Sequence, residues 1–315
     1  MINTVETELL YDNYNRSVNS LRIQVNAICN FHCIFCHMEG TERSMEYMTP
    51  EQIERVVQVA ASHGVNKIKF TGGEPLLRED IIEIVKRTRT HITGNISLTT
   101  NGVELPKLAK GLKEAGLDRV NISMHAIDEY NFHFITGTKK DFLPIVQYGI
   151  KAAQDAGLGP IKINFVLMKN INEDQVDGMI KFCAENNCIF QLIEFEANVE
   201  KEHSEEYIKY HVSLQPVEEK IKRQALCVEH NPLHNREIYT VNSEFGKVKI
   251  EFVKPMRNAD FCRHCTRLRV TADGEFKTCL LRENDYFDIK KALQDQDELD
   301  NVYKTAVKAR IPYWR

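Results

Sequence analysis

The chain has 315 residues, which is enough for one large α/β domain or for a domain with an extension. Its 41 lysines and arginines nearly balance 45 acidic residues, and the formal net charge of -4 argues against a general nucleic-acid binder. The sequence has no apolar run near the roughly 18 residues needed to cross a bilayer, and its N-terminal stretch is too polar for a signal peptide. We therefore expect a cytosolic protein, away from membranes, with nine reduced cysteines.

The first two thirds of the chain alternate between β-rich runs and amphipathic helical segments. The predicted strands are Leu21–Asn26, Val65–Phe70, Asn95–Thr100, Arg119–Met124, Ile161–Met168 and Cys188–Phe195. The predicted helices between them are Pro50–Ser62, Glu79–Arg89, Leu105–Ala115, Phe142–Ala156 and Asn172–Asn186. Six strands alternating with helices predict a parallel sheet with right-handed crossovers. We assign residues 1–197 to an α/β fold, an open, partial (β/α)6 barrel whose reactive groups gather at the carboxyl ends of the strands.

The alternation stops after residue 197, and we assign residues 198–315 to a C-terminal α+β extension. The expected elements are one helix, Pro216–Ala225, two short strands, Glu237–Asn242 and Lys247–Val253, and a charged helical tail. We expect this extension to cap the mouth of the barrel.

Three cysteines follow the first predicted strand at C-x3-C-x2-C spacing: Cys29, Cys33 and Cys36. Three thiolates can hold three irons of a 4Fe–4S cluster and leave the fourth iron open, unlike the four cysteines of ordinary electron-transfer clusters. An open iron can bind and reduce a small molecule. A zinc site is the alternative, and it would need a fourth ligand such as His32 or His37.

A second cysteine group, Cys262, Cys265 and Cys279, has C-x2-C-x13-C spacing in the extension. It again lacks an obvious fourth thiolate. We interpret it as an auxiliary cluster whose open iron can hold a substrate atom. A zinc knuckle completed by His264 is the alternative.

Arg267 and Arg269 lie between the last two of these cysteines. On an extended segment their side chains point to one face, because residues alternate across a strand. Paired guanidinium groups bind phosphates through bidentate, charge-assisted hydrogen bonds. The pattern indicates a phosphate site, and an edge strand with solvated arginines is the alternative.

The string CNFHCIFC resembles the signature of radical S-adenosylmethionine (SAM) enzymes, and TGGEPL after the second strand resembles their GGEP motif. Paired glycines let a backbone approach a ligand closely. The resemblance implies that the open iron binds the amino and carboxylate groups of SAM, and that one electron yields a 5′-deoxyadenosyl radical. The residues that it places around SAM are Phe35, Gly72, Gly73, Glu74, Ser123 and Glu196.

The first triad together with CTRLRVTADG in the extension resembles the GTP 3′,8-cyclases of molybdenum-cofactor biosynthesis, the MoaA type, over about residues 11–281. The resemblance implies a lyase with two 4Fe–4S clusters. Its radical takes the ribose C3′ hydrogen of GTP, and C3′ then attacks C8 to give (8S)-3′,8-cyclo-7,8-dihydroguanosine 5′-triphosphate. Cys29, Cys33, Cys36, Arg267 and Arg269 would carry the catalysis. The implied GTP contacts are Arg16, Lys69, Thr100, Lys162, Arg267, Leu268 and Arg269.

Several positions depart from this family. Lys69 stands at a position that is usually arginine, and Glu196 at one that is commonly methionine. His125 replaces a common aspartate. Residues 309–315 lack the Gly-Gly tail of bacterial members, for which Arg310 and Arg315 are candidate substitutes.

Two other functions stay open: a radical peptide maturase with an auxiliary cluster, and a non-catalytic iron–sulfur or zinc protein. The paired arginines favour a triphosphate over a peptide, and the GGEP motif with two open irons favours an enzyme. The partners implied are a ferredoxin- or flavodoxin-type reductant and a downstream cyclic pyranopterin monophosphate synthase. We expect no nucleic-acid partner and either a monomer or a homodimer.

Overall fold

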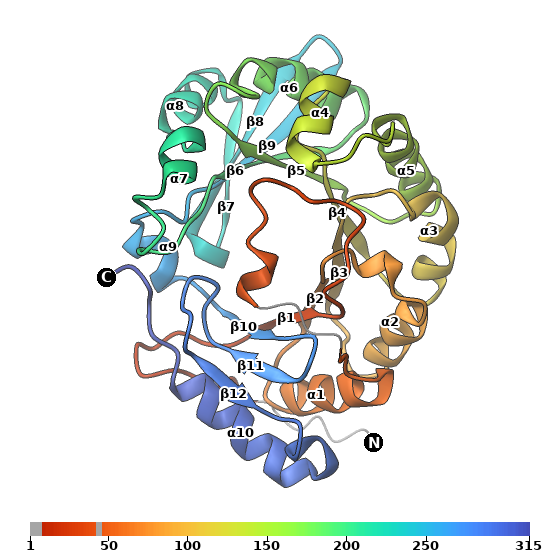
Figure 1. Cartoon of the computed structure of the whole chain (residues 1–315), viewed down its shortest axis with the longest axis vertical. Helices are drawn as coiled ribbons and strands as arrows, with labels where there is room; N and C mark the ends of the chain where they lie inside the picture. The colour runs from red at the N-terminus through yellow and green to blue at the C-terminus, as the bar shows by residue number, and fades with distance from the viewer. Residues whose placement is uncertain (1–7, 42–45) are drawn as a thin grey trace.

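The structure is a computed structural model that describes residues 8–41 and 46–315. Six parallel strands alternate with helices in its N-terminal part and form the wall of a ring (Figure 1). This arrangement confirms the predicted α/β class and the open, partial barrel. The six strands are β1 (Ser20–Gln24), β2 (Lys67–Thr71), β3 (Asn95–Thr100), β4 (Arg119–Ser123), β5 (Lys162–Leu167) and β6 (Ile189–Glu194).

Helices cover the outer face of these strands (Figure 1). They are α1 (Pro50–Ser62), α2 (Ile81–Arg89), α3 (Leu105–Glu114), α4 (Glu129–Thr136), α5 (Leu143–Asp155) and α6 (Val176–Glu185), with short turns η1 (Met38–Gly40), η2 (Pro75–Leu77) and η3 (Glu173–Gln175). Only α4 was not predicted. Its end signals are present in the sequence, since the Asp128 side chain caps the backbone N–H of Asn131 and Gly137 ends the helix at a φ of 63°.

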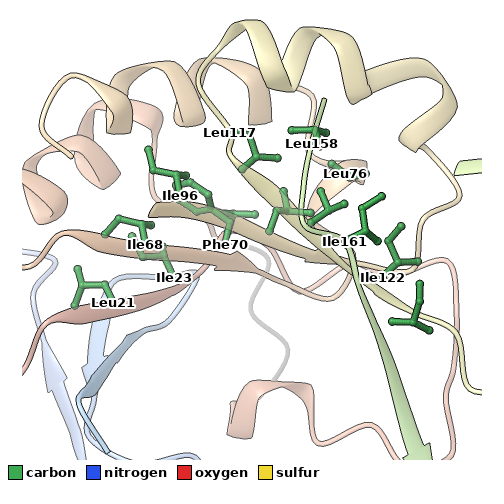
Figure 2. Close-up of a cluster of buried hydrophobic side chains, with 14 of the residues drawn as sticks. Leu21, Ile23, Ile68, Phe70, Leu76, Ile96, Leu117, Ile122, Leu158 and Ile161 are labelled. Carbon is green, nitrogen blue, oxygen red and sulfur yellow. The ribbon is translucent and has the colours of Figure 1, made fainter. Parts of the chain in front are cut away.

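Alternation along each strand sorts apolar from charged side chains. Leu21 and Ile23 of β1 and Phe70 of β2 are fully buried and point toward the helices (Figure 2). Arg22 and Lys69, which lie between the apolar positions, therefore face the inside of the ring. The same alternation that builds the core thus lines the interior with cations.

The C-terminal extension continues the barrel sheet at both of its edges. Its elements are α7 (Glu205–Tyr210), α8 (Gln215–Gln224), β7 (Cys227–Asn231), η4 (Leu233–Asn235), β8 (Arg236–Ser243), β9 (Gly246–Val253), α9 (Ala259–Arg263), β10 (Arg267–Val270), β11 (Glu275–Lys277), β12 (Tyr286–Asp288), η5 (Ala292–Gln294) and α10 (Gln296–Lys308). The sheet order is β12-β11-β10-β1-β2-β3-β4-β5-β6-β9-β8-β7.

We expected the extension to cap the mouth of the barrel, and its strand pairing adds a feature that this expectation did not include. Strand β10 pairs in parallel with β1, and β9 pairs in parallel with β6, so the extension lengthens the wall of the ring. Open strand edges carry unpaired backbone groups, and β10 and β9 satisfy those of β1 and β6. Within the described part of the chain, no helix has the length and apolar character needed to cross a membrane.

Candidate functional site

All six cysteines of the two triads line one cavity of about 670 Å³ inside the ring. The segment after β1 enters the middle of the ring (Figure 1), and it carries the first triad into the cavity. Every other predicted site residue except Leu268 lines the same cavity. These residues are Arg16, Phe35, Lys69, Gly72, Gly73, Glu74, Thr100, Ser123, Lys162, Glu196, Arg267 and Arg269.

Leu268 is the exception because it occupies the opposite face of β10. Its side chain is 0% exposed and belongs to the hydrophobic core, where it lies in register with Leu21 of β1. The predicted GTP contact cannot come from this side chain, and only its backbone stays available. Arg267 and Arg269 both face the cavity, as alternation predicted.

The first triad loop is fixed to the barrel by backbone hydrogen bonds, such as that from His32 N to Thr136 O at 2.8 Å. Burial raises the pKa of Cys29 to about 11 and raises that of Cys33 further above its ordinary value. These thiols are protonated at neutral pH unless a metal binds them. Metal binding here must therefore release protons.

The donor set of the first triad fits a cluster better than a single zinc ion. Within residues 8–41 and 46–315, no group of three His, Cys, Asp or Glu side chains is arranged to hold one metal ion. A 4Fe–4S cluster takes each thiolate at a different iron, which spreads the sulfurs apart. His37, a candidate zinc ligand, is engaged elsewhere: its Nδ1 accepts from Glu39 N at 3.1 Å, and its Nε2 lies 3.4 Å from a Glu196 oxygen.

The two glycines of the GGEP motif are required by the triad loop itself. A Cβ on Gly72 would lie 2.2 Å from the side-chain oxygen of Asn26, and one on Gly73 would lie 2.3 Å from the carbonyl oxygen of Ile28. No side chain fits at such distances. The motif thus seats the loop that carries Cys29, in addition to its predicted contact with SAM.

Glu74 ties together the carboxyl ends of two strands. Its carboxylate accepts hydrogen bonds from Thr100 Oγ1 at 2.6 Å, Asn101 N at 2.7 Å and Leu76 N at 3.0 Å. Burial raises its pKa to about 7, although these donors favour the charged form. Glu74 and Thr100 therefore hold each other in place, and their predicted ligand contacts stay predictions.

Two departures from the family pattern have structural partners. The ring of His125 packs against Phe35 with centroids 4.4 Å apart, and its Nδ1 accepts from Val166 N at 3.0 Å. Burial lowers the pKa of His125 to about 3, so this side chain is uncharged. For Glu196, burial alone would raise the pKa, but His37 together with the charges of Arg269 and Arg22 outweighs burial and lowers the pKa. The acid at position 196 thus has a basic partner on the first triad loop.

The second triad is assembled from three places in the extension. Cys262 lies in α9, Cys265 lies just before β10, and Cys279 follows β11. Burial raises the pKa of Cys279 to about 11. Burial would also raise that of Cys265, but the positive charge of Arg310 and other neighbouring cations outweigh it and lower the pKa.

Residues 310–314 pack against this second triad. Arg310 is 1% exposed and donates to the carbonyl oxygen of Cys265, while Trp314 N donates to Cys262 Sγ at 3.4 Å. Arg315 instead lies over the ring of Tyr14 and does not line the cavity. Of Arg310 and Arg315, only Arg310 lies beside the second triad.

A row of cations crosses the cavity wall at one level. In the strand register, Arg269 of β10 lies beside Arg22 of β1, and Arg22 lies beside Lys69 of β2. The row continues through Ser97 of β3 to Arg119 of β4. Sequence reasoning missed Arg22 and Arg119. The alternation of Arg22 with apolar neighbours was visible in the sequence, but its place beside Lys69 depends on the pairing of two distant strands.

These cations outnumber their acidic partners. Glu39 accepts from both Arg22 and Arg269, each at 2.6 Å. The side chains of Lys69 and Arg267 make no hydrogen bond or ion pair within the described ranges 8–41 and 46–315. Burial, reinforced by neighbouring cations, lowers the pKa of Lys69 well below its usual value and that of Arg267 to about 9. Unpaired cations that line a cavity away from bulk water indicate an anionic ligand.

Glu251 of β9 holds two further cations at the cavity wall. It accepts a hydrogen bond from Lys162 and lies 3.2 Å from Arg236, and its own side chain is fully buried. Burial alone would raise its pKa, but Arg236 and Lys162 outweigh it and lower the pKa to about 2. Arg16 is similarly held by Asp12, with Nε 2.8 Å from the carboxylate.

Replacing Glu251 by glutamine should destabilise the fold by about 3 kcal/mol at pH 7, because two partly buried cations lose their counter-ion. The pKa of Glu251 is about 2 in the folded protein and about 4.3 in the unfolded chain. The stabilisation by the charged Glu251 is therefore complete above about pH 4.3. It is lost as the pH falls toward 2. Urea denaturation of both proteins between pH 6 and pH 3 should show the stability difference shrinking in acid. A difference that stays constant would contradict the ion-pair account.

Two family models match the chain. The Radical SAM superfamily matches residues 23–183, and Molybdenum Cofactor Synthesis C matches residues 188–315. A probable GTP 3′,8-cyclase of Thermoplasma volcanium is 56% identical over 98% of this chain and 93% of that protein. One of Thermococcus kodakarensis is 43% identical over 98% of this chain and 100% of that protein.

Solved structures share the fold at low sequence identity. Streptococcus suis SuiB bound to S-adenosylmethionine has a TM-score of 0.65 and 18% identity, over 92% of this chain and 67% of that chain. The structure described as native anSMEcpe with bound AdoMet and Cp18Cys peptide has a TM-score of 0.60 and 17% identity, over 92% of this chain and 84% of that chain. This likeness shows the fold alone.

Proposed function

Because the chain belongs to the GTP 3′,8-cyclase family of the radical SAM superfamily, we propose that it converts GTP to (8S)-3′,8-cyclo-7,8-dihydroguanosine 5′-triphosphate. The observation that carries this proposal is the shared cavity. Two cysteine triads and a row of cations converge there, and two cations of the cavity, Lys69 and Arg267, have no acidic partner in the described structure. The product is the first intermediate on the route to molybdopterin.

Membership of the superfamily implies one 4Fe–4S cluster and SAM. The residues present fit both: Cys29, Cys33 and Cys36 face the cavity, and Gly72 and Gly73 hold the chain close behind their loop. When bound, SAM and the cluster supply the 5′-deoxyadenosyl radical that removes the C3′ hydrogen of GTP. The protein contributes the thiolates, the orientation of SAM and the enclosure of the radical.

The second cluster is part of the proposal, with Cys262, Cys265 and Cys279 as its ligands. These thiols stand on the wall built by the extension, whereas the first triad enters from β1. The guanine would bind at the open iron of this cluster. GTP would then lie between the two metal centres, with its ribose toward the radical source.

The cations would bind the triphosphate. Lys69 and Arg267 can bind phosphate without breaking an ion pair in the described structure. Lys162 is positioned by its hydrogen bond to Glu251. Charge-assisted hydrogen bonds from such groups fix a phosphate firmly. The cation row would therefore anchor the phosphates and leave the ribose in a fixed position. Fixed positioning lowers the entropic cost of hydrogen transfer.

A radical peptide maturase is the alternative, and the solved neighbours include a SuiB structure bound to precursor peptide SuiA. Because that structure is only 17% identical to this chain, the similarity shows a shared fold and does not indicate a shared substrate. A peptide backbone offers no charge to the unpaired cations of the cavity, whereas a triphosphate neutralises them. The cavity chemistry therefore supports a nucleotide.

An anaerobic incubation with SAM, a strong reductant and GTP tests the function. We expect 5′-deoxyadenosine to form only when GTP is present, together with a cyclised nucleotide that mass spectrometry identifies. ATP in place of GTP is the control and should give neither. If 5′-deoxyadenosine forms equally well with GTP, ATP or no nucleotide, and no cyclised product appears, the assignment is wrong.

The proposed reaction also implies partners. SAM cleavage consumes an electron, for which we propose a ferredoxin- or flavodoxin-type donor. The cyclised nucleotide would pass to a cyclic pyranopterin monophosphate synthase.

A further inference from the structure

The short segment His37–Gly40 connects the two cysteine triads. It begins directly after Cys36 and includes η1. Met38, Glu39 and Gly40 all have positive φ angles, of 47°, 56° and 70°. Non-glycine residues rarely adopt this conformation, and contacts with the surrounding structure must maintain it.

Contacts with the extension supply that restraint. Tyr286 of β12 donates a hydrogen bond to Gly40 O at 2.6 Å. A Cβ on Gly40 would lie 2.5 Å from the carbonyl oxygen of Leu280, the residue that follows Cys279. The segment that leaves the first triad therefore rests on the chain beside the second triad.

Glu39 makes the electrostatic part of this connection. Its carboxylate bridges Arg22 of β1 and Arg269 of β10, at 2.6 Å from each guanidinium group. The three side chains are 10%, 19% and 12% exposed, so water screens them weakly. Glu39 thus neutralises the two arginines on which the proposed triphosphate site depends.

A triphosphate entering this site meets a carboxylate of its own charge sign. Lys69 and Arg267, which lack acidic partners in the described structure, would attract the phosphates first. The phosphates and Glu39 would then compete for Arg22 and Arg269. Like charges repel strongly where the side chains are mostly buried and weakly screened, so the phosphates and Glu39 cannot both keep these arginines at once.

We propose that Glu39 is a displaceable counter-ion, which the phosphates of GTP expel from Arg22 and Arg269. This inference rests on the proposed function and adds a consequence to it. The expelled Glu39 frees the segment beside Cys36, so nucleotide binding at the cation row is transmitted to the loop that carries the first cluster. By linkage, any change that frees Glu39 favours nucleotide binding to the same extent.

Nucleotide affinity tests the proposal. We would measure the Kd of GTP, GDP and guanosine by anaerobic calorimetry on the reconstituted enzyme and on Glu39→Gln. Glutamine is neutral and close in size, so it should compete less for the arginines. We expect GTP to bind about tenfold more tightly to the variant, within the range typical of linked binding. The gain should be smaller for GDP and absent for guanosine.

Glu202→Gln is the matched control, because Glu202 is also a buried acid paired with an arginine, Arg257 at 3.0 Å, but it does not line the cavity. Its GTP affinity should equal that of the unaltered enzyme. Glu39→Asp keeps the charge on a shorter side chain and should give an intermediate gain, which covers the case in which the glutamine variant does not fold.

Hydrogen–deuterium exchange supplies a second measurement. In the unaltered enzyme, GTP should speed exchange in residues 37–40, and in Glu39→Gln exchange should already be fast without nucleotide. Equal or weaker GTP binding by Glu39→Gln would overturn the proposal and leave the proposed function intact. Failure of the unaltered enzyme to prefer GTP over ATP would instead overturn the proposed function.

Discussion

Replacing Cys265 by alanine should abolish the cyclised nucleotide while SAM cleavage continues. Cys265 lies just before β10 in the extension, whereas the triad that would hold the SAM-cleaving cluster is carried by the loop after β1. Removing one thiolate of three should empty the second site and leave the first intact. Iron should fall from about eight atoms per chain to about four, since each cluster contains four.

The measurements are iron content, 5′-deoxyadenosine and cyclised product in one anaerobic assay. Cys227→Ala is the matched control, because Cys227 is an exposed free thiol on β7 outside the cavity. It should retain full iron content and full product. Cyclised product from Cys265→Ala at the unaltered rate would remove the second triad from the mechanism.

Replacing Lys69 by methionine should weaken GTP binding by at least about thirtyfold, which corresponds to about 2 kcal/mol, the lower end for loss of a desolvated charge partner. Lys69 faces the cavity, has no acidic partner within the described residues, and lies beside Arg22 in the strand register. Methionine keeps most of the side-chain volume. The loss of GTP affinity therefore measures the contribution of the Lys69 charge.

The same substitution should leave the unfolding temperature unchanged or raise it. Burial and neighbouring cations lower the pKa of Lys69, which shows that its charge is unfavourable in the folded protein without a ligand. Calorimetry gives the Kd, and thermal unfolding gives the stability. Lys86→Met on the exposed face of α2 is the control and should alter neither. A large loss of stability in Lys69→Met would show that the lysine serves the fold.

The predicted β/α alternation was accurate because it depends on local patterns. Strands such as β1 and β2 alternate apolar and polar residues, and helix α1 begins at a threonine cap followed by proline. These signals act over a few residues and need no knowledge of the partner strand. Helix α4 was missed although its caps, Asp128 and Gly137, are in the sequence.

The site was predicted in its parts but not in its charge balance. The cysteine triads, the glycine motif and Arg267 with Arg269 could be predicted because their spacing is local, and all of them line the cavity. The side chain of Leu268 does not line the cavity, since alternation on β10 buries it, so its predicted GTP contact stays a prediction for the backbone alone. Arg22, Arg119 and Arg236 were missed, and so were the acids that restrain the cations, Glu39 and Glu251.

The sequence by itself determined the candidate metal ligands, the glycine motif after β2 and the faces of each strand, because thiol spacing and period-two alternation are set within a few neighbouring residues. The tertiary structure alone decided which charges meet. Arg22 and Arg269 are 247 positions apart in the numbering, yet parallel pairing of β1 with β10 sets them side by side and Glu39 between them. Electrostatic energy depends on distance in space, so the counter-ions of this cavity follow only from the fold.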